Sequence, residues 1–428
     1  MDIFDKDSFK SDIGKRIAKR QFGYDFEDEE SEENSIIKES KKNDFRPVVQ
    51  KDKSNDITVK LEPEKKITRS YNNSRNVTLD SVAEYFQSKN VIDEDDLAKK
   101  MVLAVVGETN FVLMGYSGSG KTHITDKLVN LLDDVYTIQQ SSDLAIFHDA
   151  DELNKMKFLY APEMQKIIKD KKSPLLEALK DITEGKDSYR IVTKKNGKGV
   201  DVTRIKHNKT VISTLAYENN FQMDRELQRR MLTLSTKYDS EHLKKIHDHK
   251  AKNRYDLDLM AGDERGLEDS LRNHIRASMS LDGFVIDPYS VSLREVLPPT
   301  QKSVGYVDHY YALLDGSVKF HHKKRENGRY KDKKVFLTSI EDHFHVASIY
   351  MDEFINTLND LKTEEEMVEE VSVKNINWDA YMRKGIEILE NSLDLQSLRI
   401  RNNGLIDRWK EKELEYLSVI DDGNAYMG

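Results

Sequence analysis

The segment Asn110–Thr122, which reads NFVLMGYSGSGKT, decides the fold that we expect for this chain. Its first part, Asn110–Met114, is a short apolar run typical of a buried β-strand. The second part matches the spacing G-x-x-x-x-G-K-[ST], and a helical pattern follows at His123–Leu132. Glycines let backbone N–H groups wrap around phosphate oxygens, and a helix N-terminus adds partial positive charge. The order of strand, glycine turn and helix therefore predicts a phosphate-binding loop.

Each residue of this motif has an expected role toward a nucleoside triphosphate. Lys121 would lie against the β- and γ-phosphates, and the Thr122 hydroxyl would bind Mg²⁺. ATP and Mg²⁺ are therefore the predicted cofactors. We expect nucleotide contacts from Gly115, Tyr116, Ser117, Gly118, Ser119, Gly120, Lys121, Thr122 and Ser213.

Short apolar segments alternate with helical patterns downstream of the loop. Strands are expected around Val135–Ile138 and at Lys157–Ala161, Thr210–Ala216 and Met231–Leu234. This alternation predicts an α/β fold whose parallel sheet is covered on both faces. Between two of these strands, Tyr189–Thr193 and Val200–Ile205 alternate apolar and polar residues around Asn196-Gly197, which predicts a β-hairpin.

Changes in composition divide the chain into four predicted parts. Apolar residues are sparse and unperiodic in residues 1–77, so we expect a disordered charged arm. Residues 78–240 are the expected nucleotide-binding core, which begins with a helix capped by Asp80. A helical lid is predicted at 241–362, with a polar loop at His322–Lys334 and one short strand at Val335–Thr338. A helical tail is predicted at 363–428, and the arm or the tail would bind a protein partner.

Composition also excludes several classes of protein. The chain has no cysteine, which excludes disulfides, cysteine-ligated metal centres and a thiol nucleophile. Its net charge of −9 excludes a globally basic nucleic-acid binder but leaves room for a local basic patch. The longest apolar runs, such as Met101–Val106, are too short to cross a bilayer. We therefore expect a soluble cytoplasmic protein with no membrane association.

Hydrolysis of a bound triphosphate requires a carboxylate that orients or deprotonates the attacking water. Glu163 is the best candidate, because it follows the expected strand Lys157–Ala161 and ligands bind at the carboxyl edge of open α/β sheets. The alternative is a glutamate at a helix start that interacts with the helix dipole. Ser213 and Thr214, near the end of another strand, would contact the γ-phosphate or the water, or would only satisfy neighbouring backbone groups.

An arginine pair follows in Arg225–Met231, which reads RELQRRM. An arginine placed opposite the γ-phosphate of a neighbouring subunit would stabilise the charge of the transition state. Solvated arginines on a helix surface are the alternative interpretation.

The order of these features resembles the AAA+ ATPases. A hairpin placed before the fourth strand is similar to the clade of the minichromosome-maintenance helicases and MoxR-type ATPases. The resemblance covers about Leu79 to Leu358 and implies a homo-oligomeric ring, expected to be a hexamer. In that comparison Arg230 matches the arginine finger, and Ser213 and Thr214 fall in the first sensor region.

Two positions depart from the family's pattern. Pro162 stands where most such ATPases carry an aspartate that assists Mg²⁺, so metal binding would depend on Thr122 and the phosphates. Gly305 stands at the position usually held by a second-sensor arginine of the lid, and Arg294 is a candidate substitute.

The turn of the predicted hairpin carries Lys194, Lys195 and Lys198. In related helicases such hairpins engage nucleic-acid phosphates, which gives affinity without sequence choice. A merely solvated turn is the alternative on charge alone. The basic turn favours an ATPase that acts on DNA as a helicase, loader or replication factor. The acidic total charge and Pro162 favour the alternative, a MoxR-like ATPase that remodels a protein partner or a nucleotide-gated assembly switch.

Overall fold

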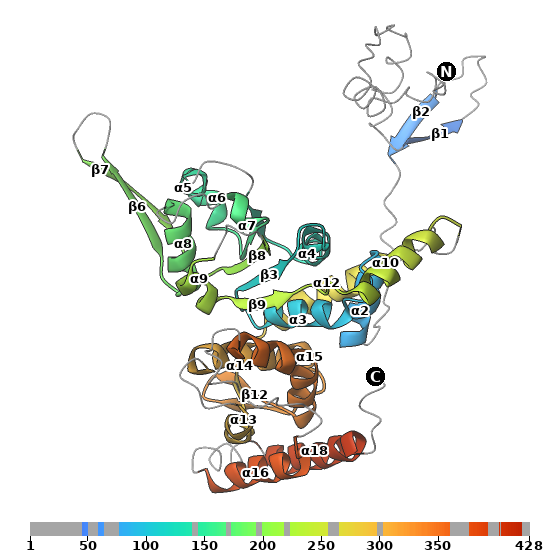
Figure 1. Ribbon diagram of the computed structural model, residues 1–428, viewed down its shortest axis with the longest axis vertical. Helices are drawn as coiled ribbons and strands as arrows, with labels where there is room; N and C mark the ends of the chain where they lie inside the picture. Colours follow the sequence, from blue (N-terminus) through green and yellow to red (C-terminus); the bar gives the residue numbers. More distant parts are fainter. Residues whose placement is uncertain are drawn as a thin grey trace, which may run out of the picture. The chain divides into compact units, whose positions relative to one another are not determined.

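The chain divides into two compact units, Met1–Tyr71 and Asn72–Gly428. The computed structural model describes residues 45–49, 59–63, 77–138, 144–167, 173–193, 199–217, 223–255, 265–297, 303–359, 376–392, 402 and 404–421. In the first unit β1 (Phe45–Val49) pairs antiparallel with β2 (Val59–Pro63) (Figure 1). The predicted arm therefore contains a pair of short strands, and its expected disorder stays a prediction.

The second unit contains a five-stranded sheet, of which β3, β8 and β9 are labelled in Figure 1. Its strands are β3 (Phe111–Gly115), β4 (Val135–Thr137), β5 (Phe158–Ala161), β8 (Thr210–Ala216) and β9 (Leu232–Ser235). The lateral order is β4-β5-β8-β3-β9, and every neighbouring pair is parallel. The predicted α/β fold with a parallel sheet is confirmed. Because β3 lies between β8 and β9, the loop that follows β3 lies beside the carboxyl ends of both.

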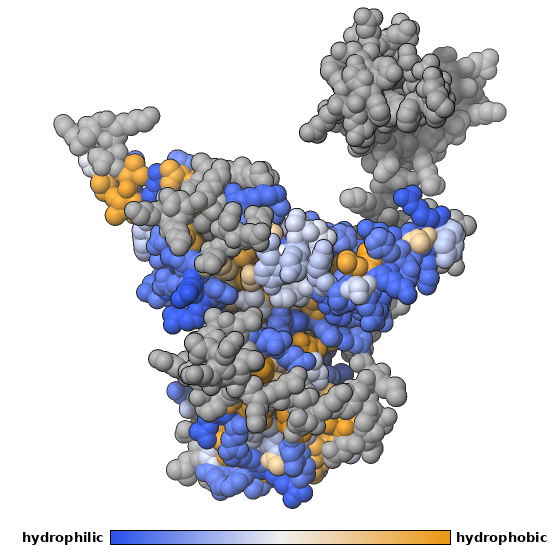
Figure 2. Space-filling view, in the orientation of Figure 1, coloured by the Kyte–Doolittle hydropathy of each residue, from blue (hydrophilic) through white to orange (hydrophobic). Residues whose placement is uncertain are grey.

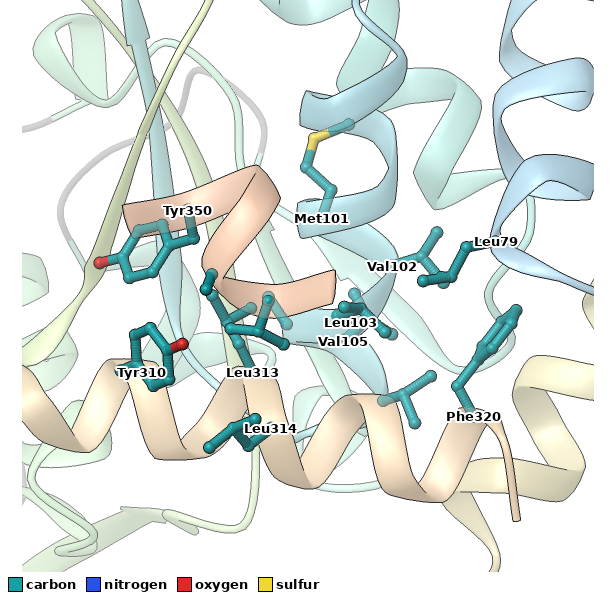
Figure 3. Close-up of a cluster of buried hydrophobic side chains, with 14 of the residues drawn as sticks. Leu79, Met101, Val102, Leu103, Val105, Tyr310, Leu313, Leu314, Phe320 and Tyr350 are labelled. Carbon is teal, nitrogen blue, oxygen red and sulfur yellow. The ribbon is translucent and has the colours of Figure 1, made fainter. Parts of the chain in front are cut away.

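The central strands β3, β5 and β8 are buried on both faces, which explains why they are largely apolar runs. Phe111 and Leu113 belong to one hydrophobic cluster, and Val112 between them belongs to another. The first cluster includes α3 (Asp95–Val106) and α14 (Ser303–Phe320), whose apolar side chains meet in Figure 3. The second includes α8 (Pro174–Thr183).

Helices of the core begin and end close to the predicted residues. The first of them, α2 (Leu79–Ser88), is capped by Thr78 rather than Asp80, so that prediction was wrong. The Thr78 hydroxyl accepts from Ser81 N, and Ser81 Oγ accepts from Thr78 N in return. This reciprocal pair satisfies two donors at the helix start, whereas Asp80 lies within the first turn.

The predicted hairpin is formed by β6 (Ser188–Thr193) and β7 (Val200–Ile205), with Thr193 paired to Val200. It contacts α8 and two short helices, α5 (Ala145–His148) and α6 (Ala150–Leu153). Figure 2 shows hydrophobic side chains gathered on it, and Tyr189, Ile191, Val200 and Val202 are each more than half exposed. The turn with Lys194, Lys195 and Lys198 lies outside the described residues.

The part of the chain after Ser240 contains more β structure than the sequence predicts. A three-stranded sheet has the order β10-β12-β11, with β12 (Lys333–Leu337) near the one expected strand. The sequence analysis missed β10 (Gly283–Ile286) and placed β11 (Asn327–Tyr330) in a polar loop. The reason is that β11 is an edge strand with mostly exposed polar residues, and it lacks the apolar alternation that marks a half-buried strand.

The other helices after Ser240 fall in the regions predicted as a helical lid and tail, although no helix was predicted at Ser290–Val296. They are α10 (Ser240–Lys252), α12 (Arg265–Met279), α13 (Ser290–Val296), α15 (Ile340–Asn359), α16 (Trp378–Asn391) and α18 (Leu405–Asp421). None of the helices in the described ranges is long and apolar enough to cross a membrane.

Two glycines allow α3 and α14 to pack with their backbones in close approach. A Cβ atom built on Gly316 of α14 would lie 2.1 Å from the carbonyl oxygen of Leu103 in α3. A Cβ atom built on Gly107, just after α3, would lie 2.2 Å from the carbonyl oxygen of Ala312. Since backbone atoms cannot move aside as a side chain can, these positions exclude any larger residue at this helix contact.

We expect Gly316→Ala to lower the free energy of unfolding by about 2–3 kcal/mol, because the added methyl group overpacks a backbone contact. Gly266→Ala is the matched control in α12, where an added Cβ meets no atom within 4 Å. The control should be neutral or stabilising by up to about 1 kcal/mol, since alanine is the better helix former. Urea denaturation followed by circular dichroism measures both variants, and equal stability of the two would contradict the close approach.

Candidate functional site

The loop between β3 and α4 (Lys121–Val129) has the backbone that the motif predicts. Gly118 and Gly120 both have a φ of 83°, in the left-handed region that residues with a side chain rarely adopt. Gly115 requires glycine for a different reason, since a Cβ atom there would lie 2.2 Å from Thr236 Oγ1. Glycine is therefore required at Gly118 and Gly120 by the left-handed backbone and at Gly115 by close packing.

Lys121 is buried and its ammonium group lies against the first residues of the loop. Its Nζ donates to the carbonyl oxygens of Gly115, at 2.9 Å, and Tyr116, at 2.6 Å. Ser117, Gly118 and Thr122 are exposed around it. The loop therefore combines accessible backbone with a cation at the N-terminus of α4, where the helix dipole favours an anion.

Hydrogen bonds from two neighbouring strands fix the loop in place. The N–H of Tyr217, which follows β8, donates to Gly115 O at 2.9 Å. Thr236, which follows β9, donates from its hydroxyl to Ser119 Oγ at 2.8 Å and from its N–H to Met114 O. The sequence analysis missed Thr236, although a polar residue directly after a strand of the same sheet is a signal that could have indicated it.

The two predicted catalytic residues Glu163 and Thr214 lie in contact. The backbone N–H of Glu163 donates to Thr214 Oγ1 at 2.8 Å, and Thr214 is fully buried. Glu163 follows β5 with a φ of 52°, an unfavourable left-handed conformation for a residue with a side chain. Its carboxylate is partly exposed and pairs with Lys166 Nζ at 2.6 Å. The hydroxyl of Thr214 thus positions the backbone of the candidate catalytic glutamate.

Ser213 does not share this position. Successive side chains of a strand point to opposite faces, so Ser213 faces away from the side that carries Thr214. Ser213 is fully buried, and its hydroxyl has no hydrogen-bond partner among the described residues. Thr214 therefore contacts Glu163, whereas Ser213 lies on the opposite face of the sheet.

Tyr160 of β5 is a further residue of this face that the sequence analysis missed. Its hydroxyl donates to Asp126 Oδ1 of α4 at 3.0 Å. Burial, and then the negative charge of Asp126, raise the pKa of Tyr160 far above its usual range. The hydrogen bond joins the strand that precedes Glu163 to the helix that begins with Lys121.

Three partly exposed tyrosines lie together beside the loop. The ring of Tyr116 contacts those of Tyr217, at 5.4 Å between centroids, and Tyr238, at 4.7 Å. Each of the three side chains is about half exposed. They follow β3, β8 and β9 in the chain, and the carboxyl ends of these strands meet at this edge of the sheet. The three rings therefore form an aromatic border at the loop.

The guanidinium of Arg230 is engaged by groups of the same chain. It donates to Lys180 O and to Glu226, each at 2.7 Å, and pairs with Glu184 at 3.0 Å. The adjacent Arg229 is exposed, and it forms no ion pair with another residue that the structure describes. Of the predicted arginine pair, Arg229 is therefore the more accessible.

Gly305 of α14, the position predicted to lie in the lid, is in contact with the aliphatic part of the Arg229 side chain. A Cβ atom on Gly305 would lie 3.4 Å from Arg229 Cδ. His309, one turn further along α14, donates from Nε2 to the carbonyl oxygen of Arg229 at 3.0 Å. Arg294 of α13 is exposed. The structure thus places Arg229, from the helix α9 (Arg225–Arg230), against the lid helix at Gly305.

A resident metal centre made of side chains is not evident in the described ranges, where no group of three or more His, Asp or Glu residues could hold an ion. Thr122, the predicted Mg²⁺ ligand, is exposed in the first turn of α4. No family model matches the chain, and no curated protein matches it. The resemblance to AAA+ ATPases therefore stays a prediction from the motifs.

We expect Glu163→Gly to be more stable than Glu163→Ala by about 1 kcal/mol, because both lose the pair with Lys166 but only glycine relieves the positive φ. The free energy of unfolding from urea titration measures the difference. The matched control is Lys166→Gly against Lys166→Ala in the helix α7 (Met164–Ile167), where the order should be reversed. The same order at both positions would contradict strain at Glu163.

Proposed function

We propose that this chain binds ATP with Mg²⁺ through Gly115–Thr122 and hydrolyses it. The observation that carries the proposal is the loop itself, with two left-handed glycines and a buried ammonium group at the start of α4. Positive φ angles turn backbone N–H groups toward one point, and a lysine at that point is the arrangement that binds polyphosphate. The residues that would hold Mg²⁺ are Thr122 and the phosphate oxygens.

The proposed hydrolysis assigns separate roles to the residues around the loop. A bound Mg²⁺ would neutralise part of the negative charge of the phosphates. Lys121 would exchange its carbonyl acceptors for oxygens of the β- and γ-phosphates. Glu163 would accept a proton from water as the water oxygen bonds to the γ-phosphorus and the bond to the leaving ADP oxygen breaks. Thr214 would hold Glu163 in position through its backbone N–H.

Lys121→Ala should lower nucleotide affinity by at least about 100-fold, because it removes the cation of the loop. Glu163→Gln should keep nucleotide affinity within a few-fold and lower turnover by about 10²–10⁴-fold, because the amide cannot accept the proton. Titration with a fluorescent ATP analogue and measurement of phosphate release separate the two effects. Lys127→Ala, on the same helix α4, is the control that should change neither. Normal turnover by Glu163→Gln would contradict the catalytic role of this residue.

We further propose that the ATPase acts on DNA as part of a homo-oligomeric ring. The hairpin β6–β7 supports this proposal because its two strands are joined by the segment that carries the predicted basic residues Lys194, Lys195 and Lys198. An arginine of α9 would reach the γ-phosphate of the neighbouring subunit. Arg230 is the family's match, but it would first have to leave Lys180 O, whereas the adjacent Arg229 is already exposed.

One observation favours the alternative, a remodelling ATPase with a protein partner. The hairpin strands expose Tyr189, Ile191 and Val202 to solvent. Exposed apolar side chains on one element are typical of protein–protein contacts, and nucleic-acid backbone contacts rely instead on cations. The two proposed functions therefore differ in the residues of the hairpin that bind the ligand. DNA would be bound by the lysines of the turn, and a protein partner by the apolar side chains of the strands.

We expect DNA to stimulate ATP hydrolysis, and we expect the triple change of Lys194, Lys195 and Lys198 to alanine to abolish that stimulation while basal hydrolysis is kept. The matched control replaces three exposed lysines of α10, Lys244, Lys250 and Lys252. Steady-state phosphate release with and without single-stranded DNA, at two salt concentrations, measures the effect. Two results together would favour the protein-remodelling alternative. The rate of hydrolysis would not change when DNA is added. In the presence of a co-purifying protein, it would change when Ile191 and Val202 are both replaced by serine.

A further inference from the structure

A groove of about 430 Å³ lies at the opposite edge of the sheet from the phosphate-binding loop. Its lining includes Lys157 and Thr210, which stand at the amino ends of β5 and β8, whereas the loop lies at the carboxyl ends. Lys209 and His207 line it from the segment that joins β7 to β8, and Met156 lines it from the segment before β5. The groove is therefore separate from the candidate nucleotide site.

Three of the basic side chains in this groove already have acidic partners. Lys155 pairs with Glu152, Lys157 with Glu108 and His207 with Asp187. Their charges are thus compensated within the chain, and they do not by themselves attract a ligand.

Lys209 is different, because it is buried and pairs with no carboxylate in the part of the chain that the structure describes. The residue is 7% exposed, and its Nζ donates to the carbonyl oxygen of Met156 at 3.0 Å. No carboxylate among the described residues forms an ion pair with it. An ammonium group has three N–H donors, so one carbonyl leaves it incompletely satisfied. A buried charge of this kind is costly unless a partner is supplied.

A second cation increases the demand for an anion at this place. Burial lowers the pKa of Lys209, and the charge of nearby Lys206 lowers it further. Lys206 itself is exposed, while its N–H donates to Asn154 Oδ1, and the N–H of His207 donates to Asp187. These hydrogen bonds fix the backbone at residues 206 and 207. Lys206 does not itself line the groove, and its charge acts on Lys209 from the adjacent surface.

We infer that this groove binds a phosphate oxyanion, with Lys209 Nζ as its buried donor and Lys206 as the second cation. A tetrahedral oxyanion offers the acceptors that Lys209 lacks, and its negative charge offsets both ammonium groups. Two sources fit this chemistry: free phosphate, and the phosphodiester backbone of a nucleic acid that passes the base of the hairpin β6–β7. The inference does not depend on nucleotide binding at Gly115–Thr122.

The test measures binding of inorganic phosphate to the full chain carrying Lys121→Ala, which removes the cation of the other phosphate site. Isothermal calorimetry at constant ionic strength, with chloride as the reference anion, gives the affinity. Lys209→Met should weaken phosphate binding by about 10-fold or more, because a hydrogen bond to a charged group is lost. Lys209→Arg should retain binding within a few-fold, and Lys244→Met on α10 is the control that should leave it unchanged.

Folded Lys209→Met protein that binds phosphate as tightly as its parent would overturn the inference. If Lys209→Met does not fold, the exposed Lys206→Ala variant tests the site instead. We expect Lys206→Ala to lower phosphate affinity by about 3-fold or more. An unchanged phosphate affinity would overturn the inference. If a thymidine 20-mer competes with phosphate for binding, the ligand is the phosphodiester backbone of a nucleic acid. If the 20-mer does not compete, the ligand is free phosphate. A failure of the nucleotide proposal would appear separately, as unchanged ATP binding in Lys121→Ala.

Discussion

The position of β3 between β8 and β9 is the constraint on which the candidate site depends. It allows Tyr217 and Thr236 to hold the glycine loop from both sides through Gly115 O and Ser119 Oγ. A loop with two left-handed glycines would otherwise lose much conformational freedom on becoming ordered. Because the flanking strands supply these hydrogen bonds, the loop is shaped before a ligand binds.

The neighbouring strands β5 and β8 extend the same arrangement to the candidate catalytic residues. Thr214 is fixed in the buried ladder, and its hydroxyl fixes Glu163 in a conformation that costs energy. Tyr160 then ties β5 to α4 through Asp126. The loop lysine and the glutamate are therefore positioned by one hydrogen-bonded framework, although they lie far apart in the chain.

Features of the fold and the site that depend on a local sequence pattern could be predicted, whereas features that depend on tertiary contacts could not. Buried strands such as Phe111–Gly115 are apolar on both faces and were found, whereas the polar edge strand Asn327–Tyr330 was not. The glycine loop was recognised because its spacing reflects local backbone geometry. The face on which Ser213 or Thr214 lies, and the partners of Arg230, depend on tertiary packing that no local pattern records.

The helix α9 illustrates how tertiary packing changes the meaning of a motif. Arg230 anchors this helix to the core through Lys180 O, while the carbonyl oxygen of Arg229 accepts from His309 of α14. The aliphatic part of the Arg229 side chain lies beside α14 at Gly305, where a Cβ atom would be 3.4 Å from Arg229 Cδ. A displacement of α14 relative to the sheet must therefore move Arg229 or break its contact with His309. Gly305, where the predicted family pattern would have a second-sensor arginine, and the exposed Arg229 belong to one contact, so the position of α14 bears directly on the accessibility of Arg229.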